Sequence, residues 1–204
     1  MKKLLFIAAA VLSLAACLDT EARIDLASDQ SGTIGIDYSI DTELLSTGSF
    51  DKDPSLWPLP VSHEDFQRSA ALVPGLELTS YSTSESGNST RITAKLKFAT
   101  LDALNSFYAP GRTAISISDS GSEVTYRQRI FDGMEQPVSA QTEQFFQDFL
   151  GDDSLSLSVH APRTVTQVSD GTISKDKRTA RITLRLADLV KTRDAVDWEI
   201  HWQK

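Results

Sequence analysis

Cysteine and histidine have the most distinctive side-chain chemistry in this chain, and both are rare. The sequence contains one cysteine, Cys17, and three histidines, His63, His160 and His201. A metal site usually needs several such ligands close together. These histidines are far apart and fall in different expected elements, so we expect no metal and no cofactor.

Catalysis by a serine or cysteine nucleophile has little support in the sequence. Such a nucleophile needs a base that is itself oriented by a third group. The serines fall mainly in expected turns, and no Gly-x-Ser-x-Gly elbow is present. The acidic pair Glu64-Asp65 fits the start of a helix, and Asp152-Asp153 fits a solvated segment after another. We therefore expect no catalytic residues and no enzyme activity.

The first sixteen residues have the composition of an export signal. Two lysines precede an uncharged apolar run from Leu4 to Ala15. A membrane-spanning helix needs about 20 apolar residues, and this run is shorter. We expect residues 1–16 to be a signal peptide that is cleaved between Ala16 and Cys17.

Residues 14–17, Leu-Ala-Ala-Cys, resemble the lipobox of bacterial lipoproteins. The resemblance implies that Cys17 carries a diacylglyceryl group, with acyl chains such as palmitate, and that the membrane is a partner through this lipid. Two or three chains anchor stably, since each buried methylene contributes about 0.8 kcal/mol. The alternative is an ordinary secretory signal, which would leave an unpaired thiol in an oxidising compartment. Leu18, rather than aspartate, follows Cys17, which favours the outer membrane, facing the periplasm, if the organism has two membranes.

The charge balance excludes one class of partner. The chain has 20 basic and 28 acidic side chains and a formal net charge of −8. This charge repels phosphate backbones, and no basic stripe with interleaved aromatic residues is present. We therefore expect no nucleic-acid partner.

Alternation of apolar and polar residues dominates the rest of the chain and predicts β-strands. Period two places successive side chains on opposite faces of a strand, and the intervening Gly, Asn, Asp and Ser turns are typical of hairpins. The expected strands contain residues 24–26, 34–40, 76–78, 92–98, 115–117, 124–130, 155–159, 165–168, 182–186 and 196–202. We expect one domain, 23–204, joined to the lipidated N-terminus by a tether, 17–22.

About three short helices should interrupt the hairpins. Ser62 and Asp65 fit a capping box, and Thr100 and Ser139 fit the N-caps of two further helices. Each segment has apolar residues at helical spacing, so each helix should cover a sheet. The predicted class is therefore α+β, a largely antiparallel sheet of hairpins with the helices packed on one face.

The long connection at residues 41–61 is the least regular part of the expected domain. Long irregular segments inside domains are often functional. Trp57 could fold down with Phe50 and Leu56 as a plug on a sheet edge, which we favour. Alternatively, it could act as a lid over an apolar pocket or as an exposed recognition residue. Phe66, Phe145 and Phe149 on two of the helices could line such a pocket.

The order of these features resembles the LppM-type domain of bacterial lipoproteins. The similar features are Cys17, a strand at 23–26, a glycine-containing turn at 31–33, a strand at 34–40, and a later strand, Asp170-Gly171 turn and strand across 165–186. The resemblance implies an antiparallel sheet with helices on one side and an envelope role in lipid or glycolipid binding. It transfers no site residue, and Ala180 to Ile182 lacks a tryptophan that the pattern would place there.

Two functions are compatible with these expectations. The first is a membrane-anchored envelope lipoprotein that binds a lipid, a glycolipid or another apolar ligand in a pocket. The second is a scaffold lipoprotein that contacts an envelope protein, which the acidic surface and the lack of convergent polar residues favour.

Overall fold

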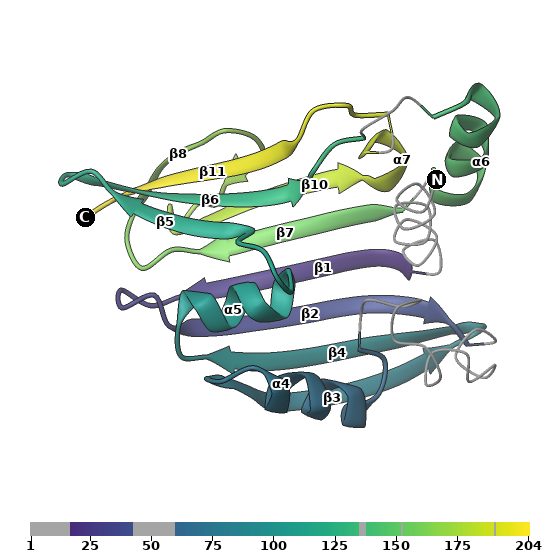
Figure 1. Ribbon diagram of the computed structural model, residues 1–204, viewed down its shortest axis with the longest axis horizontal. Helices are drawn as coiled ribbons and strands as arrows, with labels where there is room; N and C mark the ends of the chain where they lie inside the picture. The colour runs from purple at the N-terminus through teal and green to yellow at the C-terminus, as the bar shows by residue number, and fades with distance from the viewer. Residues whose placement is uncertain (1–16, 43–59, 135–137, 152, 190) are drawn as a thin grey trace.

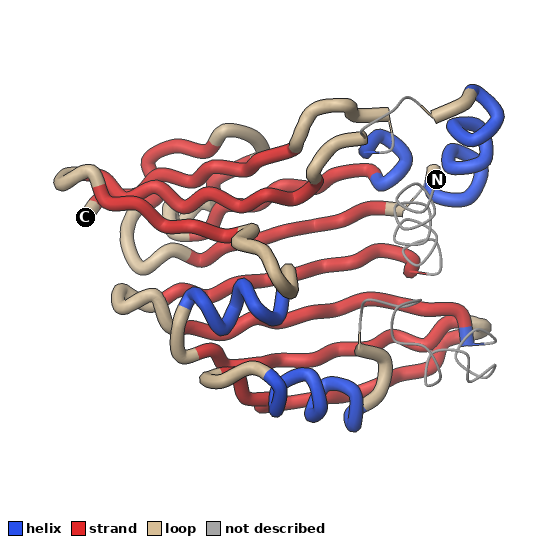
Figure 2. Tube along the Cα trace, in the orientation of Figure 1, coloured by secondary structure: helices blue, strands red, loops and turns tan. Residues whose placement is uncertain are grey.

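The computed structural model describes residues 17–42, 60–134, 138–151, 153–189 and 191–204. These residues form two β-sheets and four helices (Figures 1 and 2). The large sheet has seven strands, in the spatial order β3 (Leu76–Ser86), β4 (Ser89–Phe98), β2 (Gly32–Asp41), β1 (Cys17–Leu26), β7 (Ser154–His160), β10 (Thr179–Arg185) and β9 (Thr172–Ile173). The small sheet has four, in the order β5 (Ile115–Asp119), β6 (Glu123–Phe131), β11 (Val196–Gln203) and β8 (Val165–Val168). The helices are α4 (His63–Leu72), α5 (Leu101–Tyr108), α6 (Ala140–Leu150) and α7 (Leu186–Leu189).

Neighbouring strands run antiparallel in both sheets, with one exception at the centre of the large sheet. There β1 and β7 pair in parallel, with Ala22 opposite Leu157. A parallel pair needs a long connection, which here contains every element from β2 to α6. The predicted class, α+β with a largely antiparallel sheet, is confirmed.

The hydrophobic core lies between the large sheet and a second layer formed by α4, α5 and the small sheet (Figure 1). Phe66 of α4, Leu104 of α5 and Trp198 of β11 are fully buried. They belong to the same cluster as Ile34 and Leu96 of the large sheet. One contiguous core therefore joins both sheets.

The opposite face of the large sheet, which we call the outer face, points to solvent. From Thr90 to Phe98, β4 alternates strictly between buried and exposed residues. The exposed residues of β4 are Arg91, Thr93, Lys95 and Lys97. Those of β10 are Arg181, Thr183 and Arg185. This one-sided burial produces the period-two pattern of the sequence.

The helix starts follow the predicted capping chemistry. The Ser62 hydroxyl accepts a hydrogen bond from the backbone N–H of Asp65 at 3.1 Å, and the Asp65 carboxylate accepts one from the N–H of Ser62 at 3.2 Å. Thr100 and Ser139 cap α5 and α6 in the same manner through their hydroxyls. The three predicted N-caps are confirmed, and no helix in the described part of the chain is long and apolar enough to span a membrane.

Residues 17–22, predicted as a tether, are instead the first half of β1. Cys17 pairs with Ile40 of β2, and Thr20 pairs with Leu155 of β7. The segment has little apolar alternation of its own, and it becomes a strand by pairing with β2, its hairpin partner, and with the distant β7. The described fold therefore begins at Cys17 and not at residue 23.

The prediction of one sheet with all the helices on one face also needs correction. The small sheet forms a separate layer over part of the large sheet, a place that we expected helices to fill. Helix α6 lies beyond the strand ends beside the short α7 (Figure 1). Lys191, which follows α7, contacts α6 through Glu143 at 3.7 Å and Gln147 at 3.2 Å. Where the small sheet already covers the large sheet, no helix can cover it as well.

Candidate functional site

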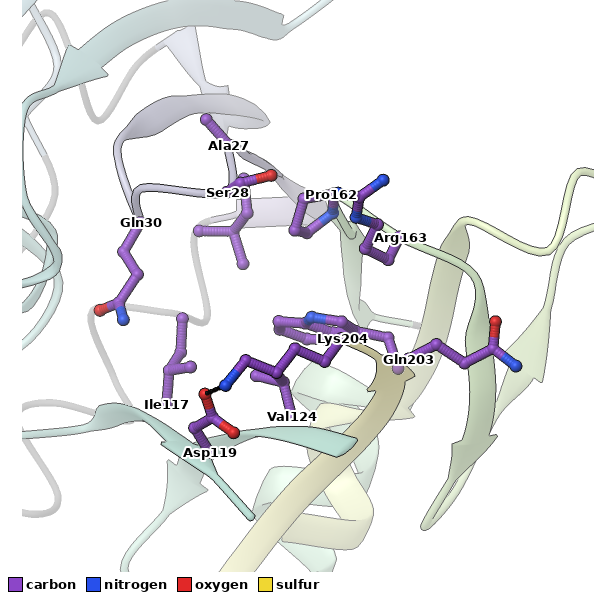
Figure 3. A pocket seen from close by; sticks show the side chains of 12 residues that line it. Ala27, Ser28, Gln30, Ile117, Asp119, Val124, Pro162, Arg163, Gln203 and Lys204 are labelled. Carbon is purple, nitrogen blue, oxygen red and sulfur yellow. Dashed lines mark ion pairs between the residues drawn. The ribbon is translucent and has the colours of Figure 1, made fainter. Parts of the chain in front are cut away.

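A pocket lies where the ends of the two sheets meet, at the opposite end of β1 from Cys17 (Figure 3). Its volume is about 240 Å³. Four segments line it: the end of β1 with the β1–β2 turn, the β5–β6 hairpin, the connection from β7 to β8, and the end of β11. The pocket therefore depends on how the two sheets pack against each other.

The β1–β2 turn holds one wall of the pocket in a defined conformation. Asp29 Oδ1 accepts hydrogen bonds from the Ser31 hydroxyl at 2.6 Å and the Ser31 N–H at 3.1 Å. These bonds, the hydroxyl first, lower the pKa of Asp29. Gln30 adopts a φ of 66°, in the left-handed region that few residues other than glycine occupy. The turn places the side chains of Ser28 and Gln30 at the pocket.

The β5–β6 turn forms the facing wall. Asp119 Oδ1 accepts a hydrogen bond from the Gly121 N–H at 2.7 Å, and Gly121 has a φ of 95°. Asp119 Oδ2 lies 2.6 Å from Lys204 Nζ (Figure 3). The hydrogen bond from Lys204, followed by the one from Gly121, lowers the pKa of the Asp119 carboxyl group. This contact links β5 to the end of β11.

Part of the pocket lining is apolar. Trp202 and Leu26 are buried, and Ile117 and Val124 are half-buried. The Trp202 ring also lies against Tyr126, with ring centroids 6.5 Å apart.

One cation at the rim is not neutralised. Arg163 lines the pocket, is exposed, and makes no ion pair or side-chain hydrogen bond with any residue that the structure describes. Lys204, in contrast, is paired with Asp119. The rim therefore offers a guanidinium group to an anionic ligand.

Of the four residues predicted to line an apolar pocket, only Phe66 has a described side chain, and it does not line this pocket. Phe66 is fully buried in the core, with its ring centroid 5.7 Å from that of Tyr81. Trp57 and the side chains of Phe145 and Phe149 lie outside the described residues. In Figure 1, α4 covers the large sheet, whereas α6 lies apart from it, beside α7.

Sequence reasoning missed Arg163, Trp202 and Lys204 as site residues. The turns at residues 27–31 and 119–122 were readable from their Asp, Ser and Gly content. The local sequence of the two turns does not indicate that they lie at the same end of two facing sheets. Only their spatial proximity makes a pocket of them.

Cys17 and the histidines have separate surroundings. Cys17 is the first residue of β1, and Ala16 lies outside the described residues. His160 Nδ1 lies 3.1 Å from the Thr179 hydroxyl. His201 Nδ1 lies 3.2 Å from a Glu123 carboxylate oxygen. Among the described residues, no three His, Cys, Asp or Glu side chains are grouped so that they could hold a metal ion.

Comparisons with known proteins give structural similarity but no match of sequence or family. No family model matches the chain, and no curated protein matches its sequence. Among solved structures, the chain is similar to the NMR structure of the folded domain of LppM from Mycobacterium tuberculosis. The sequences are 16% identical, the match covers 91% of this chain and 89% of that chain, and the TM-score is 0.49.

Proposed function

We propose that the protein is a bacterial envelope lipoprotein, anchored through Cys17, that binds a small amphipathic ligand in the pocket at the far end of β1 and has no enzymatic activity. The observation that carries this proposal is the combination of an apolar part of the lining with a cation, Arg163, that has no described partner at the rim. The ligand is a molecule with a short apolar part and an anionic group.

The size of the pocket limits the ligand. Its 240 Å³ is below the ~300–1,000 Å³ of pockets that enclose drug-sized molecules. It corresponds to about eight water molecules at liquid density. A lipid or glycolipid would therefore insert only the end of one acyl chain, whereas a short-chain carboxylic acid would fit as a whole.

The orientation relative to the membrane supports a role on the side away from the anchor. β1 has ten residues, and its first and last, Cys17 and Leu26, lie at opposite ends of the strand. At about 3.3 Å per residue, the pocket lies roughly 30 Å from the lipid attachment point. Because β1 begins at Cys17, a lipid there would hold that end of the sheet close to the membrane, while the pocket lies at the other end of β1. With Leu18 after Cys17, we propose the outer membrane as the anchoring surface in an organism with two membranes.

The chemistry of the lining favours binding over catalysis. Among the described residues that line the pocket, none is a histidine or cysteine, and the one carboxylate, Asp119, is held by Lys204. A general base or nucleophile would need a free, activated side chain in this position.

The proposal is tested by titrating the purified protein, in a nonionic detergent, with hexanoate and with hexanol while observing the methyl NMR signals of Ile117 and Val124. We expect both compounds to shift these signals, and hexanoate to bind more tightly because of Arg163. The R163Q variant should weaken hexanoate binding about tenfold and leave hexanol unaffected.

Two controls make the result specific. Arg193 is exposed in the connection before β11, outside the pocket, so R193Q should bind hexanoate like the unmodified protein. V124F places a larger side chain in the pocket and should weaken both compounds. Unchanged binding in V124F, or no methyl shifts with either compound, would refute the proposed site.

A further inference from the structure

A row of five residues crosses the middle of the outer face, at right angles to the strands. In register, Lys95 of β4 lies opposite Gly35 of β2, which lies opposite Arg23 of β1. Arg23 lies opposite Ser158 of β7, and Ser158 opposite Arg181 of β10. We call these five residues the central row. It contains three cations and no carboxylate, although the chain as a whole has a net charge of −8.

Ser158 is an unusual member of the central row because its hydroxyl is buried and has no partner. The residue is 1% exposed, and Ser158 Oγ makes no hydrogen bond in the structure. Buried polar atoms nearly always have a partner, so such an atom needs an explanation. Gln128 Nε2 is also buried without a partner, but the strand neighbours of Gln128 are Ile115 and Trp198. Ser158 differs because an arginine stands on each side of it.

Arg23 also has no side-chain partner within the part of the chain that the structure describes. It makes no ion pair or side-chain hydrogen bond with any described residue. The nearby acids have other contacts. Asp25 accepts a hydrogen bond from the Thr33 hydroxyl at 3.4 Å, and Asp37 accepts one from Arg91 at 2.7 Å. Glu21 lies 3.3 Å from Arg181. The Glu21 contact is half-exposed, so it is weak and a stronger anion can displace it.

Gly35 leaves open space next to Arg23. A Cβ atom at Gly35 would meet only the Arg23 carbonyl oxygen, at 4.0 Å. Glycine inside a strand often marks a place where another group approaches the backbone. The outer face is therefore open to a ligand on one side of Arg23 and has a buried donor on the other.

We propose that Arg23, Ser158 and Arg181 bind the phosphoryl group of a phosphate-bearing ligand on the outer face. Side chains opposite one another on adjacent strands have Cβ atoms about 4.5–5.5 Å apart, so both arginines can reach over Ser158. Their planar guanidinium groups match the oxygen pairs of a phosphate, and the Ser158 hydroxyl donates to a third oxygen. This site lies on the outer face and is independent of the function proposed for the pocket.

The test is a calorimetric titration of the purified protein in nonionic detergent, at constant ionic strength, with inorganic phosphate and separately with glycerophosphoglycerol, a water-soluble lipid headgroup. We expect saturable binding of at least one. Tighter binding of glycerophosphoglycerol identifies a lipid headgroup as the source of the phosphoryl group. Equal or tighter binding of inorganic phosphate identifies a free phosphate. Either result supports the site.

Variants separate this site from general attraction to positive charge. R23Q should weaken phosphate binding about tenfold, because a charge-assisted bond is lost. R91Q removes a cation of the same face that is outside the central row and paired with Asp37, so binding should change less than about twofold.

Ser158 provides a second readout that does not depend on charge. S158A should weaken phosphate binding several-fold but should not lower the melting temperature of the unliganded protein, since the hydroxyl has no partner to lose. The proposal would be overturned if neither compound showed saturable binding at concentrations up to about 10 mM. Binding that R23Q and S158A leave unchanged would overturn it as well.

Discussion

Asn105 offers a direct test of how α5 holds the pocket-forming hairpin in place. Asn105 Oδ1 accepts hydrogen bonds from the N–H groups of Ala114 at 3.0 Å and Ile115 at 2.8 Å, and Asn105 Nδ2 donates to the Ile115 carbonyl at 2.8 Å. The side chain is buried. It therefore satisfies three backbone groups at the start of β5, the strand that carries Ile117 and Asp119 to the pocket.

We predict that N105A lowers the free energy of unfolding by about 3 kcal/mol. Each buried group left without a partner costs roughly 1–3 kcal/mol, and the lower end applies because water can enter the space left by the side chain. In a chain of this length, each kcal/mol lowers the melting temperature by about 2–4 °C. The expected decrease is therefore about 6–12 °C.

The measurement is denaturant unfolding and thermal melting of N105A beside a matched control. N88A makes the same substitution in the exposed β3–β4 turn, where the Asn88 side chain makes no hydrogen bond with a described residue. This control should stay within about 0.5 kcal/mol of the unmodified protein. A loss below about 1 kcal/mol in N105A would refute the reasoning that this side chain alone satisfies the three groups. N105A should also weaken hexanoate binding, because β5 loses its fixed position.

Two further predictions concern pH and backbone conformation. The hydrogen bond from Arg129 lowers the pKa of Asp197, so this pair between β6 and β11 stabilises the fold above the ordinary aspartate pKa and loses its effect as the pH falls through the lowered value. D197N should therefore be less stable than the unmodified protein at pH 7, and the difference should disappear in strongly acidic urea titrations. At Gly171, with a φ of 85°, a Cβ atom would lie 2.1 Å from the Arg181 carbonyl oxygen, so G171A should destabilise by more than about 2 kcal/mol in urea unfolding. G87A, where a Cβ atom meets nothing within 4 Å, should cost only about 1 kcal/mol, and equal losses would contradict the steric argument.

The hairpins and helix starts could be predicted because their signals are local. Alternation in β4 reflects one buried and one exposed face, and the Ser62–Asp65 capping box depends on residues three apart. The tether at 17–22 was predicted wrongly for the complementary reason. That segment becomes a strand because it pairs with β2 and β7, and its own sequence does not predict this pairing.

The candidate sites depend on contacts between residues that are distant in the sequence. Trp202 and Leu26 belong to opposite ends of the chain and meet only because the small sheet packs over the large one. In the same way, Arg23 and Arg181 flank Ser158 because β1 pairs in parallel with β7. Pairing at such separations is selected by the total burial of the core and not by local preference.

The sequence by itself therefore determined the strands, the turns, the caps and the α+β class, since each follows from the backbone preferences and burial pattern of a short segment. It also predicts an export signal and a lipidated Cys17 from the first seventeen residues. Tertiary structure alone decided that the described residues form two sheets, that β1 extends back to Cys17, and that the pocket and the central row exist. The physical reason is that a site consists of side chains brought close together in space. The strand register that brings them together is set only when the whole core is assembled.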